Sequence, residues 1–225
     1  MEGNDDEKYF FNFSFFQIDP KWRWMSDLAK EESAKEVENV IKNSGIKFRT
    51  YSTLGLRSDA DFLFLFAAKS IEEIQSVISK LYLTVFGKYI VPTQTYVSCT
   101  RPSIYARNGR TIAFVAGNES KKYVVVYPFT KTREWYLLSK EDRQKMMNEH
   151  IDVSQKYPDI VLNTTYSFGI DDQDFMLAFE TDDLRNFQDL IMDLRETKVS
   201  AYVKVDTPML VCVKKDIIPL IGNLG

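Results

Sequence analysis

YSTLGLRSDADFLFLFAAKSIEEIQSVISKL at residues 51–81 and YSFGIDDQDFMLAFETDDLRNFQDLIMDL at residues 166–194 decide the fold, because they are two copies of one unit. From Ser58 and Asp171 onward they align without a gap, at an offset of 113 residues. A repeat at a fixed period indicates a duplicated supersecondary unit, and it takes precedence over other patterns. The matched pairs include Asp59 and Asp172, Asp61 and Asp174, Phe62 and Phe175, Phe66 and Phe179, and Leu81 and Leu194.

Each copy predicts a turn, an aromatic-rich β-strand and then an amphipathic helix. A polar residue precedes the helix in both copies: Ser70 in the first, and Asp182 or Asp183 in the second. Such residues cap helix N-termini. Apolar residues then recur three or four positions apart, so that each helix has one apolar face for a sheet.

Strand-like runs surround both copies and predict an α+β protein. These runs are 9–18, 46–54, 61–66, 95–100, 112–115, 123–129, 160–166, 175–180 and 201–213. Strands that flank helices twice over favour two ferredoxin-like repeats. We expect an N-terminal repeat over residues 1–115 and a C-terminal repeat over residues 116–225. The alternative is one irregular α+β domain with chance similarity, which the ungapped match disfavours.

The composition excludes several classes of function. The net charge of −3 argues against a nucleic-acid-binding protein, since phosphate binding needs clustered positive charge. No apolar run is long enough to cross a bilayer. Residues 1–8 are acidic and polar, unlike a signal peptide, which favours a cytoplasmic protein. Cys99 and Cys212 form no Cys-x-x-Cys motif and are expected to be small core residues.

His150 is the single histidine in the chain, which excludes sites that need several imidazoles. It lies in residues 138–157, where Ser139 and Asp142 form a capping-box-like start and Pro158 follows the end. Met146, Met147, His150, Val153 and Tyr157 share one helix face. A neutral imidazole on an apolar face suits an axial haem ligand. A core histidine with a satisfied hydrogen bond is the alternative.

The segment YVVVYPFTKTREWYLLSKEDRQKMMNEH at residues 123–150 resembles the chlorite dismutase family, especially its coproheme decarboxylase branch. The similar motifs are Tyr127-Pro128-Phe129-Thr130-Lys131, Trp135-Tyr136-Leu137-Leu138, Met146 to His150, Gly169-Ile170-Asp171-Asp172, Leu194-Arg195 and Val199-Ser200-Ala201. The resemblance covers residues 120–213. It implies a dimeric α+β barrel of two duplicated ferredoxin-like repeats, the C-terminal one carrying a haem site, assembled into a homo-oligomer that is usually a pentamer.

The resemblance also implies a role for each matched residue. His150 would ligate the iron of haem or of iron coproporphyrin III, and Tyr127 would be the redox-active tyrosine. Lys131, Arg195 and Ser200 would hold porphyrin propionates, Lys131 also positioning the propionate that reacts. Cations suit this task because they form charge-assisted hydrogen bonds with carboxylates. Trp135 would either carry electrons or only pack.

Two departures from the family pattern favour the decarboxylase branch. Chlorite-degrading members have a distal arginine, whose position here is Leu162 or Asn163, and a glutamate on the proximal histidine, whose position here is Val199. An imidazole without a carboxylate partner is a weaker donor to iron. One departure points the other way: the chain has no distal glutamine or histidine, which many decarboxylases use to cleave peroxide.

The resemblance therefore implies a haem-dependent oxidoreductase that uses hydrogen peroxide to decarboxylate iron coproporphyrin III to haem b. Tyr127 would become a radical and take hydrogen from a propionate. The alternatives are a haem-binding sensor or carrier with only weak peroxidase activity, a chlorite dismutase-like enzyme, which the missing arginine disfavours, and a related barrel that binds no haem.

Overall fold

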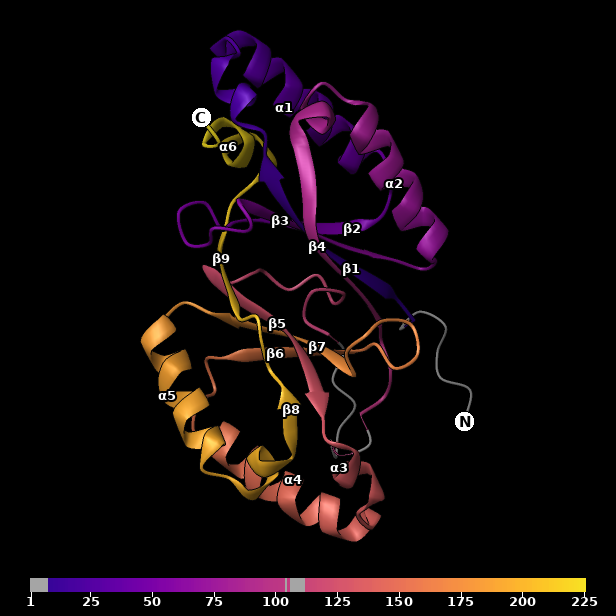
Figure 1. The fold of residues 1–225 in the computed structure, drawn as a ribbon, viewed down its shortest axis with the longest axis vertical. Helices are drawn as coiled ribbons and strands as arrows, with labels where there is room; N and C mark the ends of the chain where they lie inside the picture. The colour runs from indigo at the N-terminus through magenta and orange to yellow at the C-terminus, as the bar shows by residue number, and fades with distance from the viewer. Residues whose placement is uncertain (1–7, 104, 106–111) are drawn as a thin grey trace. The chain divides into compact units, whose positions relative to one another are not determined.

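The computed structural model describes residues 8–103, 105 and 112–225. The chain forms two compact units, each an α+β structure: unit 1 combines Met1–Cys99 with Val211–Gly225, and unit 2 is Thr100–Leu210 (Figure 1). The C-terminal segment therefore packs with the N-terminal part of the chain. The expected end of the first repeat at residue 115 stays a prediction.

Unit 1 is an antiparallel sheet with helices on one side (Figure 1). Its elements are β1 (Phe10–Ile18), η2 (Pro20–Trp24), α1 (Asp27–Lys42), β2 (Lys47–Ser52), β3 (Phe62–Ala68), α2 (Ile71–Leu83), η3 (Phe86–Tyr89), β4 (Ile90–Cys99), β9 (Leu210–Lys214) and α6 (Ile217–Gly222). The strands lie in the order β4-β1-β3-β2-β9, all antiparallel.

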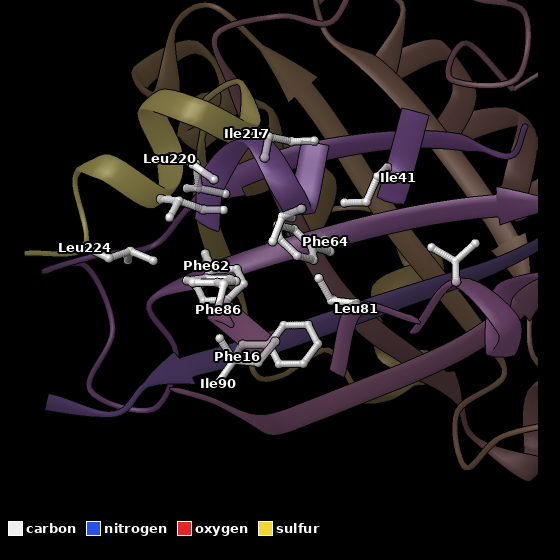
Figure 2. Packing of buried hydrophobic residues seen from close by; sticks show 14 of the residues in the cluster. Phe16, Ile41, Phe62, Phe64, Leu81, Phe86, Ile90, Ile217, Leu220 and Leu224 are labelled. Atoms are coloured by element: carbon white, nitrogen blue, oxygen red, sulfur yellow. The ribbon is translucent and has the colours of Figure 1, made fainter. Parts of the chain in front are cut away.

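A filled apolar core joins the helices of unit 1 to its sheet (Figure 2). Every residue of β3 is buried. From α1, Val37 and Ile41 are fully buried, and from α2 Leu81 is as well. Burial of large apolar side chains is the main source of stability in such a layer, at about 2 kcal/mol each.

Unit 2 repeats the topology of unit 1. Its elements are β5 (Tyr123–Lys131), α3 (Arg133–Leu137), α4 (Lys140–Ser154), β6 (Val161–Tyr166), β7 (Phe175–Thr181), α5 (Leu184–Arg195), η4 (Lys198–Tyr202) and β8 (Val203–Val205). The strand order β6-β7-β5-β8 matches β2-β3-β1-β4 of unit 1. This β-α-β-β-α-β arrangement is ferredoxin-like, so the predicted α+β class and duplication are confirmed.

The offset of 113 residues also holds for backbone contacts outside the quoted stretches. In unit 1, Asp61 N donates to Phe16 O at 2.8 Å, and Ile18 N donates to the Asp61 carboxylate at 2.9 Å. In unit 2, Asp174 N donates to Phe129 O at 3.1 Å, and Lys131 N donates to the Asp174 carboxylate at 2.8 Å. The N-caps of α1 and α4, Ser26 and Ser139, keep the same offset, as do the buried Trp22 and Trp135.

Several expected elements were wrong or incomplete. Residues 112–115 form a turn, in which Val115 N donates to Ile112 O, and not a strand. The expected strand 201–213 is interrupted at Pro208, because proline cannot donate to a strand ladder, and only β8 and β9 remain. Strand β4 begins at Ile90, five residues before its expected start. Within the described ranges, no helix has the length and apolar character needed to span a membrane.

Candidate functional site

The register of the unit 2 sheet fixes which side chains face its helices. Tyr127 lies opposite Leu177, and Leu162 lies opposite Phe179; directly paired residues share a face of a sheet. The Tyr127 ring stacks on Phe179 at 6.0 Å, and Phe179 contacts Phe187 of α5 at 5.3 Å. The face that carries Tyr127 and Leu162 is therefore the helix-facing side, and it is called that below.

Leu162, and not Asn163, is the distal candidate that lies on the helix-facing side. Asn163 pairs with Ala178 on the opposite side. It is buried there, donating to the Glu180 carboxylate at 2.9 Å and accepting from Ala113 N at 2.8 Å. Leu162 is 46% exposed, although it lies on the helix-facing side of the sheet.

The layer between helices and sheet is incompletely filled in unit 2. On the helix-facing side, Leu162 is exposed and Thr164 and Leu177 are only partly buried. Helix α4 has no fully buried residue, although it packs beside α5 and η4. Apolar surface that is uncovered at the inner side of an amphipathic layer is typical of a ligand site.

His150 projects from α4 and is partly buried. Its Nδ1 is fully buried and has no hydrogen-bond partner among the described residues. Burial, and then the nearby Lys131 ammonium, lower the pKa of His150 to about 4. The imidazole is therefore neutral at pH 7, the form that binds metals. No acidic side chain contributes to this lowered pKa. This agrees with valine at position 199, where chlorite-degrading members have the glutamate that contacts the proximal histidine.

Lys131 lies at the end of β5, close enough to His150 to act on its charge. Its Nζ donates to Val199 O at 3.2 Å and lies 4.7 Å from the centre of the Trp135 ring. Burial lowers the pKa of Lys131 to about 8. A partly desolvated ammonium with a single carbonyl partner has donors left for an anionic group.

Tyr127 forms a second cluster with two charged residues. The tyrosine is 4% exposed. Burial first, and then Asp206, raise the pKa of its hydroxyl, whereas Arg195 acts in the opposite direction. Arg195 and Asp206 form an ion pair at 3.6 Å. The charges of a carboxylate and of a guanidinium therefore act in opposite directions on the pKa of the Tyr127 hydroxyl.

Ser200 and Trp135 have structural contacts of their own. The Ser200 hydroxyl lies 2.7 Å from both Arg195 O and Thr197 O, where it closes the end of α5. Trp135 is 2% exposed and packs against Tyr202 at 5.5 Å. Neither set of contacts tests the role that the sequence predicts for these residues.

Two residues of β5 thus each have an electrostatic neighbour on a helix: the charge of Lys131 acts on His150 of α4, and the charge of Arg195 of α5 acts on Tyr127. Ser200 stays with its own helix end. Sequence reasoning missed Asp206. The available signal was a lone carboxylate in Val205-Asp206-Thr207-Pro208, directly after a short strand.

Comparisons with known proteins identify the family of the chain. The chlorite dismutase family matches residues 30–215. A relative named coproheme decarboxylase, from Mycolicibacterium smegmatis, is 35% identical over 175 residues, which cover 77% of this chain and 75% of the relative.

Solved structures of chlorite dismutase from Candidatus Nitrospira defluvii share the fold. The complex with imidazole has a TM-score of 0.87 at 23% identity and covers 96% of this chain and 94% of that chain. A mutant in complex with cyanide gives the same TM-score, identity and coverage, 0.87, 23%, 96% and 94%. At this identity the likeness concerns the fold alone.

Proposed function

Because the chain belongs to the chlorite dismutase family, we propose that it decarboxylates iron coproporphyrin III to haem b with hydrogen peroxide. Chlorite dismutases and coproheme decarboxylases are haem-dependent enzymes, so this chain is a haem-dependent oxidoreductase. The coproheme decarboxylase relative supports the choice of substrate.

The incompletely filled layer around His150 is the observation that carries the proposal. A neutral imidazole with a buried, unpartnered Nδ1 on a partly uncovered apolar layer fits an iron porphyrin, because the iron needs an unprotonated nitrogen and the macrocycle needs apolar contacts. Among the described residues, no group of three or more His, Cys, Asp or Glu side chains is placed to hold a metal ion. An iron on His150 would thus take its other ligands from the porphyrin nitrogens.

The two cations of the site support binding of propionates. Lys131 and Arg195 both have donors available, and they lie in separate clusters. Coproporphyrin has four propionates, and each charge-assisted hydrogen bond contributes more than a neutral one. We infer that Lys131 positions the propionate that reacts and that Arg195, with Ser200, holds another.

Tyr127 is the group proposed to act on the propionate. Its buried ring is fixed by stacking on Phe179, and its raised pKa keeps the hydroxyl protonated, ready to be oxidised and not ionised. Bound iron would supply the oxidising equivalents of peroxide. The Tyr127 radical would take one hydrogen atom from the propionate β-carbon. The second oxidising equivalent of the peroxide, supplied through the bound iron, would take the remaining electron, so that carbon dioxide leaves and a vinyl group forms.

The apolar side chain at position 162 favours this reaction over chlorite breakdown. Leu162 brings no charge or hydrogen-bond donor to the helix-facing side, where chlorite-degrading members carry arginine. An oxyanion such as chlorite would therefore lack a cation at this position. A substrate that is bound through its own propionates does not need one.

The proposal is tested by following product mass. The protein is mixed with iron coproporphyrin III, peroxide is added, and stepwise loss of two carbon dioxide molecules is expected. Tyr127→Phe should abolish the loss while the Soret band of the complex remains, and Tyr123→Phe on the same strand is the matched control. Binding without loss would leave a carrier or sensor, and no Soret change with any iron porphyrin would contradict both functions.

A further inference from the structure

Two buried side-chain nitrogens of unit 2 have no hydrogen-bond partner among the described residues: Nδ1 of His150 and Nε of Arg143. Both residues belong to α4. Arg143 precedes His150 by seven residues, which is close to two full turns of an α-helix. The two side chains therefore leave the same face of α4, roughly 10 Å apart along the helix axis. Arg143 thus lies on the face that carries the candidate iron ligand.

Unit 1 has a cation at the matching position, and there the protein itself supplies its partners. At the offset of 113 residues, Lys30 of α1 corresponds to Arg143. Lys30 is 9% exposed, and its Nζ donates to Arg23 O at 3.4 Å and lies 4.0 Å from the Asp27 carboxylate. The residue that corresponds to Asp27 in unit 2 is Lys140. Unit 2 has therefore retained the cation and replaced the acidic partner with a second cation.

The unpartnered guanidinium of Arg143 indicates that an anionic ligand completes this part of unit 2. A guanidinium stays protonated in proteins, so burial cannot be relieved by loss of the charge. A buried charged group without a partner is costly, and a carboxylate would match the paired donors of arginine. The carboxylates of an iron porphyrin lie at the rim of the macrocycle, whereas the iron at its centre would bind His150. The spacing along α4 fits this arrangement.

We propose that Arg143 binds a third propionate of the porphyrin, in addition to those held by Lys131 and Arg195. The identity of the ligand rests on the proposed function, whereas the decarboxylation step is not needed for this inference. Iron coproporphyrin III has four propionates and haem b has two. At least one of the three cations must therefore lose its carboxylate in the product, so that the site prefers substrate to product.

Soret titrations with two forms of one macrocycle test this role. Iron coproporphyrin III offers carboxylates, and its tetramethyl ester offers none. Arg143→Gln should weaken binding of the acid about tenfold or more, because hydrogen bonds to charged groups typically contribute that much, and should leave binding of the ester unchanged. Arg143→Lys keeps the charge without the paired donors and should lose less. Lys145→Gln is the matched control, since Lys145 lies on another face of α4 with its side chain 67% exposed.

The stability of the porphyrin-free protein separates ligand binding from a structural role. Arg143→Met removes the unpartnered charge and should unfold at a urea concentration at least as high as wild type. Lys30→Met, the matched exchange in unit 1, breaks the contacts with Arg23 O and Asp27 and should unfold at a lower concentration. An arginine that only supports the fold would give the loss in Arg143→Met as well, which contradicts the proposal.

The titrations and the product mass together distinguish this inference from the proposed function. If Arg143→Gln binds iron coproporphyrin III like wild type, or if it weakens binding of the acid and of the ester equally, the inference is wrong. Wild-type protein that binds the acid through Arg143 but releases no carbon dioxide with peroxide would contradict the proposed function and leave this inference intact. Release of carbon dioxide together with an unchanged affinity of Arg143→Gln would do the reverse.

Discussion

The two units have the same topology but use their helix–sheet layer differently. At positions 113 residues apart, Val37 of unit 1 corresponds to His150 of unit 2, and Ile18 corresponds to Lys131. Val37 is fully buried and Ile18 is 6% exposed, whereas His150 and Lys131 are only partly buried. The candidate site therefore occupies the place of a hydrophobic core, and its ligand would supply the packing that unit 2 lacks.

Helices α1 and α4 show what this replacement means for stability. Helix α1 buries Ala34, Val37 and Ile41 against the sheet, and α4 buries no residue fully. Helix α4 is instead tied to α5 near its end, where the Tyr157 hydroxyl donates to Asp193 at 2.9 Å. A ligand that binds only the folded protein should stabilise unit 2 by mass action.

The largest effect is expected from giving α4 the residue of α1. His150→Val removes the one imidazole of the chain, so histidine ligation of an iron porphyrin and peroxide-dependent decarboxylation should both be lost. Soret titration and product mass measure the two. The porphyrin-free variant should fold at least as stably as wild type, because a buried unpartnered nitrogen is removed. A Soret titration and product yield unchanged from wild type would show that His150 is not the iron ligand.

The reverse exchange, Val37→His, should destabilise unit 1 strongly. Its layer is filled, so the larger imidazole is both overpacked and deprived of hydrogen bonds. These effects typically cost 1–3 kcal/mol each, and we expect a loss of about 4 kcal/mol in the free energy of unfolding, measured by urea denaturation. A loss below about 1 kcal/mol would mean that the two layers tolerate histidine equally. It would contradict the conclusion that the layer of unit 1 is filled and that of unit 2 is not.

The next largest effect is expected in the pH dependence of stability, because only unit 2 has a buried histidine in its helix–sheet layer. The pKa of His150 is about 4 when folded and about 6.5 in an unfolded chain. The unfolded state therefore binds the extra proton between these values, and stability is lost as the pH falls from 6.5 to 4. The loss amounts to roughly 3 kcal/mol, at about 1.4 kcal/mol per pKa unit.

His150→Val is the control for this effect, because it keeps all other titrating groups. The difference in unfolding free energy between wild type and variant should change across this pH window and level off below it. A single imidazole signal in the NMR spectrum reports the pKa directly. A constant difference, or a pKa near 6.5, would show that His150 is solvated.

The duplication was predictable from the sequence where the two copies still share residues. Asp61 and Asp174 were matched at that stage, and they make the same backbone contacts in both units. The offset also runs through α1 and α4, where it was not recognised. The two helices share few residues because the positions that fill the apolar core in α1 are candidate site positions in α4. The two sets of positions need different side chains, so the sequences no longer match there.

The role of each candidate site residue could be predicted only from the family resemblance. Which of these residues lie close together could be learned only from the structure. The helix face of His150 was predicted from spacing, but the nearby Lys131 comes from another element. The choice between Leu162 and Asn163 followed only from strand register, since a shift of one residue reverses the face. Helix α1 was missed because its face is short and interrupted by the buried Lys30 and Ser33.

The smallest effect is expected from filling the helix-facing side at position 162. Leu162 pairs with Phe179 as Phe48 pairs with Phe66 in unit 1, and Phe48 packs against the unit 1 core. Leu162→Phe should therefore bury additional ring surface and stabilise the porphyrin-free protein by about 0.5–1 kcal/mol, as measured by urea denaturation. The same ring would occupy part of the space that the porphyrin needs and weaken Soret-detected binding about tenfold.

Phe48→Leu is the matched control, which should lower the free energy of unfolding by about 1 kcal/mol and leave porphyrin binding unchanged. If Leu162→Phe alters neither quantity, the uncovered surface at this position is not part of the site, and the contrast between the two layers is confined to His150 and Lys131.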